Sequence, residues 1–207
     1  MTRRLALAAA LAALALPAAA QAAHIPFGSS LKATPNKIEK EGVDSAYWNT
    51  KLANNLKFRV PAKGKVATIK LKGNKVGSAG PNIVHFQILH PIGGGRLKVM
   101  LTSGSNKLQV NGDKNHITTY HHINMCARKG DFVAFSVVGG QAKWQVFSKV
   151  AASNINKFTG AGGDMNNDTF KGTKHAGEEL LMRTVLWTGK GSNGAGFCNS
   201  YNPSKAR

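Results

Sequence analysis

Phe132-Val133-Ala134-Phe135-Ser136-Val137-Val138 is the stretch that decides the fold. All of its side chains except Ser136 are apolar, so both faces of an extended chain would be buried here. Its β-branched and aromatic residues favour a strand, and Gly139-Gly140 marks its end. A strand buried on both faces belongs at the centre of a covered sheet. The stretch therefore predicts a central strand of a β-sandwich.

Short segments in which apolar and polar residues alternate lie on both sides of this stretch, separated by Gly, Asn and Pro turns. The other expected strands are Leu56–Val60, Lys65–Leu71, Ile83–His90, Arg96–Leu101, Lys143–Val150 and Leu180–Trp187, with weaker candidates at Leu108–Val110 and His116–Tyr120. No useful length of sequence has a helical period. We expect an all-β fold: an antiparallel, jelly-roll-like β-sandwich of about eight or nine strands, with a partly closed barrel as the alternative.

Residues 1–22 have the pattern of a secretory signal peptide, expected as a cleaved helix. Arg3 and Arg4 precede the Leu/Ala run Leu5–Leu16, and Ala20-Gln21-Ala22 fits the small-residue cleavage rule. The run would rise about 18 Å as a helix, short of the ~30 Å hydrocarbon core of a bilayer. No later stretch is long enough to span a membrane. We expect a secreted or cell-envelope-associated protein.

Residues 23–207 are expected to form a single domain. Residues 151–177 are polar, rich in Gly and Asn, and lack a clean period, so they predict a long surface loop. Residues 189–207 predict a C-terminal tail. Cys126 and Cys198 are the two cysteines, and export favours a disulfide between them that ties this tail to the body. Two free buried thiols are the alternative.

Several short motifs recur in a known group of proteins. They are Phe27-Gly28-Ser29-Ser30-Leu31, Val60-Pro61-Ala62-Lys63-Gly64-Lys65-Val66, Ile88-Leu89-His90-Pro91, Cys126-Ala127-Arg128-Lys129-Gly130-Asp131-Phe132-Val133, and Glu179-Leu180-Leu181-Met182 with Cys198. Over most of residues 23–207 the chain resembles the secreted, largely uncharacterised β-sandwich proteins of high-GC Gram-positive bacteria. The resemblance implies a jelly-roll-like sandwich and export, and it implies no catalytic residue. The chain departs from that group in being so basic.

The charge balance is the strongest functional signal. The chain has 28 Lys and Arg against 9 Asp and Glu, a formal charge of +19. Lys57, Lys70, Lys72 and Lys98 fall at outward positions of expected strands and predict a polyanion-binding face. An ordinary solvated surface is the alternative. Nucleic acid is disfavoured as a partner, because Lys far exceeds Arg and base recognition relies on Arg.

Two further sites are candidates. Tyr47 and Trp48 precede the first expected strand and are candidates for stacking on sugar rings, whereas Trp144 and Trp187 belong in the core. Asp164, Asn166 and Asp168 open a D-x-N-x-D calcium-loop pattern. However, Thr169 and His175 stand where that pattern needs Gly and Glu. A polar loop is therefore the alternative to a metal site.

Two questions remain open from the sequence. His116, His121 and His122 are clustered, but no zinc motif surrounds them, so metal binding there is undecided. No serine-hydrolase motif marks a nucleophile, and nine acids leave a carboxylate pair possible in principle. An enzyme is the less favoured class.

The leading hypothesis is a secreted, monomeric, non-catalytic binding or structural module without a cofactor. Its partner would be an anionic polysaccharide or another anionic cell-envelope polymer, bound by the Lys-rich surface. The alternative is a secreted hydrolase that acts on polysaccharide with an unidentified carboxylate pair.

Overall fold

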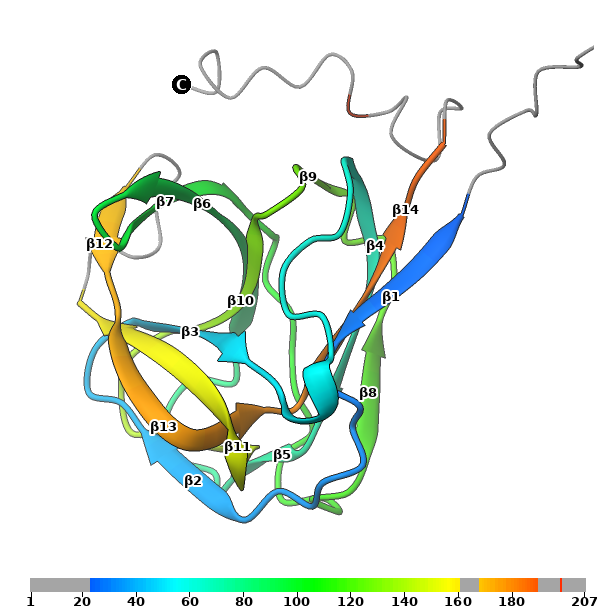
Figure 1. The fold of residues 1–207 in the computed structure, drawn as a ribbon. Helices are drawn as coiled ribbons and strands as arrows, with labels where there is room; N and C mark the ends of the chain where they lie inside the picture. The colour runs from blue at the N-terminus through cyan, green and yellow to red at the C-terminus, as the bar shows by residue number, and fades with distance from the viewer. Residues whose placement is uncertain (1–22, 161–167, 190–197, 199–207) are drawn as a thin grey trace, which may run out of the picture.

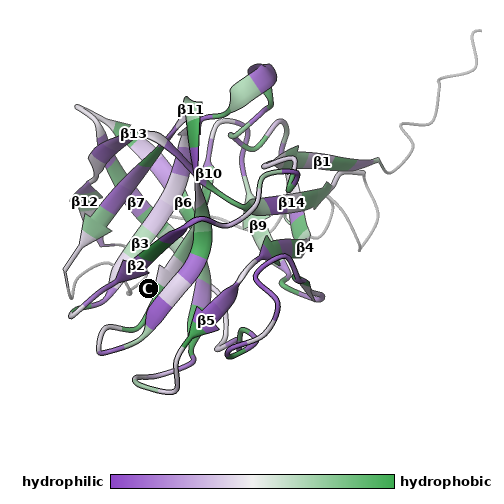
Figure 2. Ribbon diagram, turned by 90° about the horizontal axis from the view of Figure 1, so that it is seen from below, coloured by the Kyte–Doolittle hydropathy of each residue, from purple (hydrophilic) through white to green (hydrophobic). Residues whose placement is uncertain are grey.

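The computed structural model describes residues 23–160, 168–189 and Cys198. Two antiparallel β-sheets of 5 and 9 strands pack against each other (Figure 1). Hydrophilic and hydrophobic residues alternate along many of their strands (Figure 2). Within this part of the chain, no helix is long and apolar enough to cross a membrane. The expectation of an all-β antiparallel sandwich is confirmed.

The smaller sheet carries both the first and the last of its strands in sequence side by side. Its order is β1 (His24–Gly28), β14 (Met182–Trp187), β4 (Gly64–Lys72) and β8 (Ile117–Tyr120), and β9 (Met125–Ala127) also pairs with β4. Strand β4 is therefore the centre of this sheet, with β14 on one side and both β8 and β9 on the other.

The larger sheet is built around β10 (Phe132–Val137), which pairs with β6 on one side and β3 on the other. Its full order is β12 (Thr169–Lys171), β7 (Arg96–Thr102), β6 (Val84–Gly93), β10, β3 (Ser45–Lys51), β11 (Lys143–Thr159) and β13 (Thr173–Leu180). Strands β2 (Lys37–Lys40) and β5 (Asn74–Val76) also pair with β11. All six residues of β10 are buried, which confirms the prediction of a central strand.

The two faces of β10 contribute to two different cores. Val133 and Phe135 belong to the main core, which is shared with the smaller sheet. Phe132 and Ala134 face the opposite way, into a second core. The remaining buried members of that second core are Trp48, Leu89, Leu97, Val99 and Phe170. Because both faces are apolar, the larger sheet has to be covered on both sides.

The second core is covered by the curvature of the larger sheet itself. Strands β12 and β13 stand at opposite ends of the strand order, yet only Gly172 separates them in the chain. Figure 1 shows β12, β7, β6, β10 and β3 arranged as a ring. Phe170 of β12 closes it, with ring centroids 4.4 Å from Phe158 and 5.6 Å from Trp48. The barrel-like closure considered as the alternative fold is thus a property of this one sheet.

Strand β11 links the two cores by bending. Tyr47 pairs in register with Lys157 near the end of β11, but its ring packs on Phe147, with centroids 4.8 Å apart. The register of β11 shifts between Lys149 and Asn154, where four residues bulge out of the ladder. This bulge lets the two halves of one 17-residue strand take part in different packing layers.

Some local predictions were wrong. Residues 151–177 are not a surface loop in the part described, because they hold the end of β11, all of β12 and part of β13. Their small polar residues hid the strand period. Leu56–Val60 is not a strand but follows the 3-10 turn η1 (Ala53–Asn55) as an extended loop. The described residues hold 14 strands, more than expected, because strands of three or four residues are too short to show a period.

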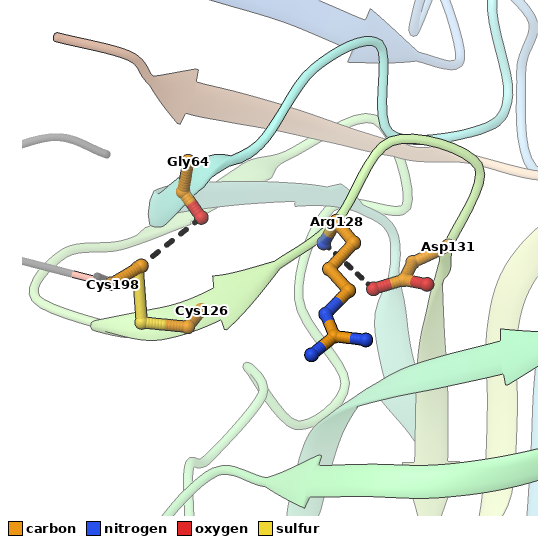
Figure 3. The surroundings of a disulfide bond; sticks show 5 residues. All are labelled: Gly64, Cys126, Arg128, Asp131 and Cys198. Atoms are coloured by element: carbon orange, nitrogen blue, oxygen red, sulfur yellow. Dashed lines mark hydrogen bonds between the residues drawn. A yellow bond between two sulfur atoms is a disulfide. The ribbon is translucent and has the colours of Figure 1, made fainter. Parts of the chain in front are cut away.

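The predicted disulfide between Cys126 and Cys198 is present, with the Cα atoms 5.5 Å apart (Figure 3). Cys126 lies on β9, and the sulfur of Cys198 lies 3.4 Å from the carbonyl oxygen of Gly64 on β4. The bond therefore fixes Cys198 against the smaller sheet. Residues 1–22, 190–197 and 199–207, which include the expected signal peptide and most of the expected tail, lie outside the described residues.

Reducing this disulfide should lower the free energy of unfolding by about 4 kcal/mol, because it closes a loop of 72 residues. Urea unfolding with and without a reductant measures the change. A double variant, Cys126→Ala with Cys198→Ala, should match the reduced protein. An unchanged urea midpoint after complete reduction would contradict the expectation.

Gly172→Ala should destabilise the curled sheet by about 1–3 kcal/mol. A Cβ atom at this position would lie 2.3 Å from Cη2 of the buried Trp48 ring. Gly104→Ala is the matched control, because nothing lies within 4 Å of its Cβ position. Equal urea midpoints for the two variants would show that the contact between Trp48 and Gly172 does not limit the packing.

Candidate functional site

Three of the carboxylates are tied to two lysines in a network at the crossing of β2, β11 and β13. Lys37 Nζ lies 2.5 Å from Glu39 and 2.6 Å from Glu178. Lys157 Nζ lies 2.5 Å from Glu41 and 3.5 Å from Glu39. The hydroxyl of the buried Tyr47 donates a hydrogen bond of 2.6 Å to Glu41. This carboxylate–lysine network is largely covered, so its acids do not face solvent.

The network shifts the pKa values of its members. Burial by itself would raise the pKa of Glu39. The hydrogen bond and charge of Lys37, together with Lys157 and a hydrogen bond with Glu41, outweigh burial and lower it. Burial alone would also lower the pKa of Lys37, but its contacts with Glu178 and Glu39 outweigh this and raise it. Both shifts favour the charged forms.

Other carboxylates are also used within the fold. Glu179 is buried and accepts hydrogen bonds from Ser29 (2.6 Å) and Ser153 (3.0 Å). Asp131 is buried and accepts the backbone N–H of Arg128 at 2.8 Å, a contact drawn in Figure 3. Burial raises the pKa of Asp131 despite this bond and the nearby His90. Since most acids have such internal roles, few remain to neutralise the surface lysines.

A groove lined by cations lies where the two sheets meet. Its middle is a cavity of about 470 Å³ over Lys57–Pro61, Lys129 and Gly130. A second cavity, of about 320 Å³, shares Arg59 with the first, and a third, of about 550 Å³, shares Lys57 with it. We call these three neighbouring cavities, which share lining residues, the basic groove. Its cations are Lys32, Lys57, Arg59, Arg96, Lys129 and Arg183, and none of its lining residues is a carboxylate.

The middle of the basic groove is fixed by backbone hydrogen bonds. Gly28 at the end of β1 donates to the carbonyl of Lys57 at 2.7 Å. Val60 donates to the carbonyl of Asp131 at 2.9 Å, and Gly130 donates back to the carbonyl of Val60 at 2.9 Å. The segment is therefore attached to the smaller sheet at one end and to the turn before β10 at the other.

Two arginines of the basic groove are held in position by neighbouring side chains. The guanidinium carbon of Arg59 lies 4.6 Å from the centroid of the Phe132 ring and 6.0 Å from that of Phe58. Such cation–π contacts orient a guanidinium without using its N–H donors. Arg96 Nη2 donates to the hydroxyl of Thr169 at 2.7 Å. Both residues are exposed, and their guanidinium groups have five N–H donors each, more than these contacts use.

The lysines predicted from sequence do not form one face. Lys57 lies in the basic groove, whereas Lys70 is exposed on β4 and Lys98 is half-buried on β7. Lys72 is buried, and its ammonium donates to the carbonyl of Leu31 at 3.1 Å. The prediction of a shared patch was wrong for Lys72, because the chain around Leu31 covers the end of β4.

The predicted sugar-stacking pair was also wrong. Tyr47 and Trp48 are 0% and 1% exposed, because β3 is an inner strand of the larger sheet and its two faces supply the two cores. Trp144 is buried as expected. Trp187 is only half-buried and stacks on His24, with centroids 4.6 Å apart, so it is not a core residue.

No metal site is apparent in the described residues. Among them, no group of three or more His, Cys, Asp or Glu side chains is placed to hold an ion. His116, His121 and His122 are exposed. Asp164 and Asn166 lie outside the described residues, and the carbonyl of Asp168 accepts a hydrogen bond from Val99 at 2.8 Å.

The comparisons with known proteins give no match: no family model, no curated protein and no solved structure is similar to this chain. The site therefore rests on its own geometry. Sequence reasoning missed Arg59, Arg96 and Arg183. The scarcity of arginine was the available signal, since residues 23–207 hold only five arginines and three of these line the basic groove.

Glu39→Gln should lower the free energy of unfolding at pH 7 by about 2 kcal/mol, the scale of a hydrogen bond to a charged group. A carboxyl whose pKa is lowered by folding adds stability above its unfolded pKa, and this stability is lost as the pH falls through the folded value. The difference from wild type should therefore shrink in acid.

Urea unfolding from pH 7 down into the acid range checks this dependence. Asp113→Asn is the control, because Asp113 is exposed and its carboxylate accepts a hydrogen bond from the nearby backbone N–H of Asn115. If the difference in free energy of unfolding between wild type and Glu39→Gln stayed constant as the pH fell, this would contradict the role given to the carboxylate.

Proposed function

We propose that the protein is a secreted, non-catalytic binding module that takes anionic polysaccharides or other anionic cell-envelope polymers in the basic groove. The observation that carries this proposal is the lining of the groove. Six cationic side chains border it, and no carboxylate does. A surface of one charge sign attracts and retains a polyanion.

The shape of the basic groove supports a polymer as the ligand. It consists of three neighbouring cavities, and the middle one shares Arg59 with one neighbour and Lys57 with the other, so a polymer long enough to cover all three would meet several cations. Single exposed ion pairs contribute little, but several acting on one polymer add up. The disulfide supports export, because such bonds persist in oxidising compartments.

The hydrolase alternative receives less support. Glycoside hydrolysis needs two carboxyls on either side of a bound sugar. Among the described residues, Glu39, Glu41 and Glu178 are linked through lysines, and each has at least one oxygen paired with Lys37 or Lys157. They lie in the carboxylate–lysine network and not in the basic groove, so a polymer bound there meets no acid or base pair.

Reversing charges inside the basic groove tests the proposal. Lys57→Glu with Lys129→Glu should weaken binding to heparin or polygalacturonate by at least about tenfold at low salt, because attraction becomes repulsion. Lys107→Glu with Lys114→Glu is the matched control. This control makes the same change in net charge at exposed sites outside the groove, and it should lower the affinity by less than about threefold.

Titration calorimetry at two salt concentrations measures these affinities, and wild-type binding should weaken as salt rises. Equal losses of affinity in the two double variants would show that net charge alone is responsible for polyanion binding. Absence of wild-type binding to every polyanion at low salt would overturn the proposed function.

A further inference from the structure

We propose that the basic groove selects acidic sugar units over other anions, with Phe58 as the surface for the sugar ring and Arg59 as the receptor for its carboxylate or sulfate. This inference rests on the proposed function and adds a ligand class to it. It is carried by the middle cavity of the groove, where an accessible aromatic ring lies among cations.

The middle cavity of the basic groove is amphipathic. Its floor includes Phe58, Val60 and Pro61, and the Phe58 ring is half-buried on the second core, parallel to Phe132 within 20°. Lys57, Arg59 and Lys129 surround this floor. A simple inorganic polyanion has no group that would occupy an apolar floor. A pyranose has an apolar C–H face and polar edges, so it can cover the ring while an acidic substituent reaches the cations.

Arg59 stands next to this floor and is already oriented. Its contact with Phe132 limits its motion before a ligand arrives, which lowers the entropic cost of binding. A guanidinium presents paired N–H donors that match the two oxygens of a carboxylate or sulfate, whereas an ammonium acts as a point charge. Arg59 is thus suited to recognise a planar or tripodal acid beside a bound ring.

Charge continues on both sides of the Phe58 floor. Arg59 also lines one neighbouring cavity, together with Arg96. Lys57 also lines the other, together with Lys32 and Arg183. An acidic polysaccharide carries charges on successive units, so units next to the stacked one find cations as well. The 470 Å³ of the middle cavity is ample for a single sugar ring.

The same geometry disfavours single-stranded nucleic acid. Proteins that bind it stack successive bases on several exposed rings. Of the aromatic side chains that line the basic groove, Phe27, Trp48 and Phe132 are each at most 5% exposed, which leaves Phe58 as the accessible ring. One ring suits one stacked sugar unit better than a run of bases.

Three probes of similar length and charge concentration separate these ligands: polygalacturonate, polyphosphate and a single-stranded oligonucleotide. Titration calorimetry should give polygalacturonate an affinity at least about tenfold higher than that of polyphosphate, the scale of one stacking contact of ~1.4 kcal/mol. The oligonucleotide should bind more weakly than polygalacturonate.

Phe58→Leu should reduce polygalacturonate affinity about fivefold or more and leave polyphosphate affinity unchanged. Phe158→Leu is the matched control. Phe158 is another half-buried ring packed on the second core, and it lies outside the basic groove. Arg59→Lys keeps the charge but loses paired recognition, so it should also weaken polygalacturonate more than polyphosphate.

The outcomes distinguish this inference from the proposed function. Equal wild-type affinity for polygalacturonate and polyphosphate would overturn the sugar-ring assignment and leave polyanion binding intact. Tighter binding of the oligonucleotide would overturn it in favour of nucleic acid. If the wild-type protein bound none of the three probes, the proposed function itself would be overturned. Thermal unfolding of each variant shows whether the fold is retained, and equal losses in Phe58→Leu and Phe158→Leu would also overturn the assignment.

Discussion

The whole architecture depends on one constraint: β10, at the centre of the larger sheet, has apolar side chains on both faces. Burying the face that carries Phe135 requires a second sheet, and the smaller sheet supplies it. Burying the face that carries Phe132 requires another cover, and the larger sheet provides it by curling until Phe170 reaches Trp48. Gly172 permits this contact because the Trp48 ring occupies the space where a Cβ would lie. The sandwich and the curl therefore have the same cause.

The charge of the protein has a similar structural explanation. Acidic side chains are few, and several of them hold strands together within the fold, as Glu39, Glu41 and Glu178 do through two lysines. Glu179 does the same through two serines. Because these acids are used inside the fold, positively charged side chains outnumber negatively charged ones at the surface. In the basic groove, six cations lie near an apolar floor, and this combination could recognise more of a ligand than its charge.

The sequence was sufficient for the features that depend on local pattern. The seven residues from Phe132, apolar except for Ser136, identified a central strand, and the two cysteines identified a disulfide; both are present. Features that depend on distant contacts escaped prediction. Tyr47 and Trp48 look exposed in sequence because nothing local shows that β3 lies between β10 and β11. Strand β12 escaped because three residues carry no period, and its burial comes from Phe170 meeting Trp48 across the curl.

For the candidate site, the sequence predicted a class of ligand but not the set of residues that line the groove. Excess Lys pointed to an anionic partner, and Lys57 was among the residues named. The groove itself is assembled from a loop, a turn and strands of both sheets, so no single stretch of sequence contains it. Lys72 illustrates the opposite error, because a lysine at an alternating position was assigned to the surface although the chain near Leu31 covers it.

The attachment of the groove segment to both sheets has a mechanical consequence. Arg183 stands on β14 of the smaller sheet and Arg96 on β7 of the larger one, and the segment from Lys57 to Val60 is bonded to the end of β1 and to the turn before β10. A long polymer lying in the groove would bridge the two layers. Tension on that polymer would then act across the side-chain packing between the two sheets, and would not peel away a single edge strand.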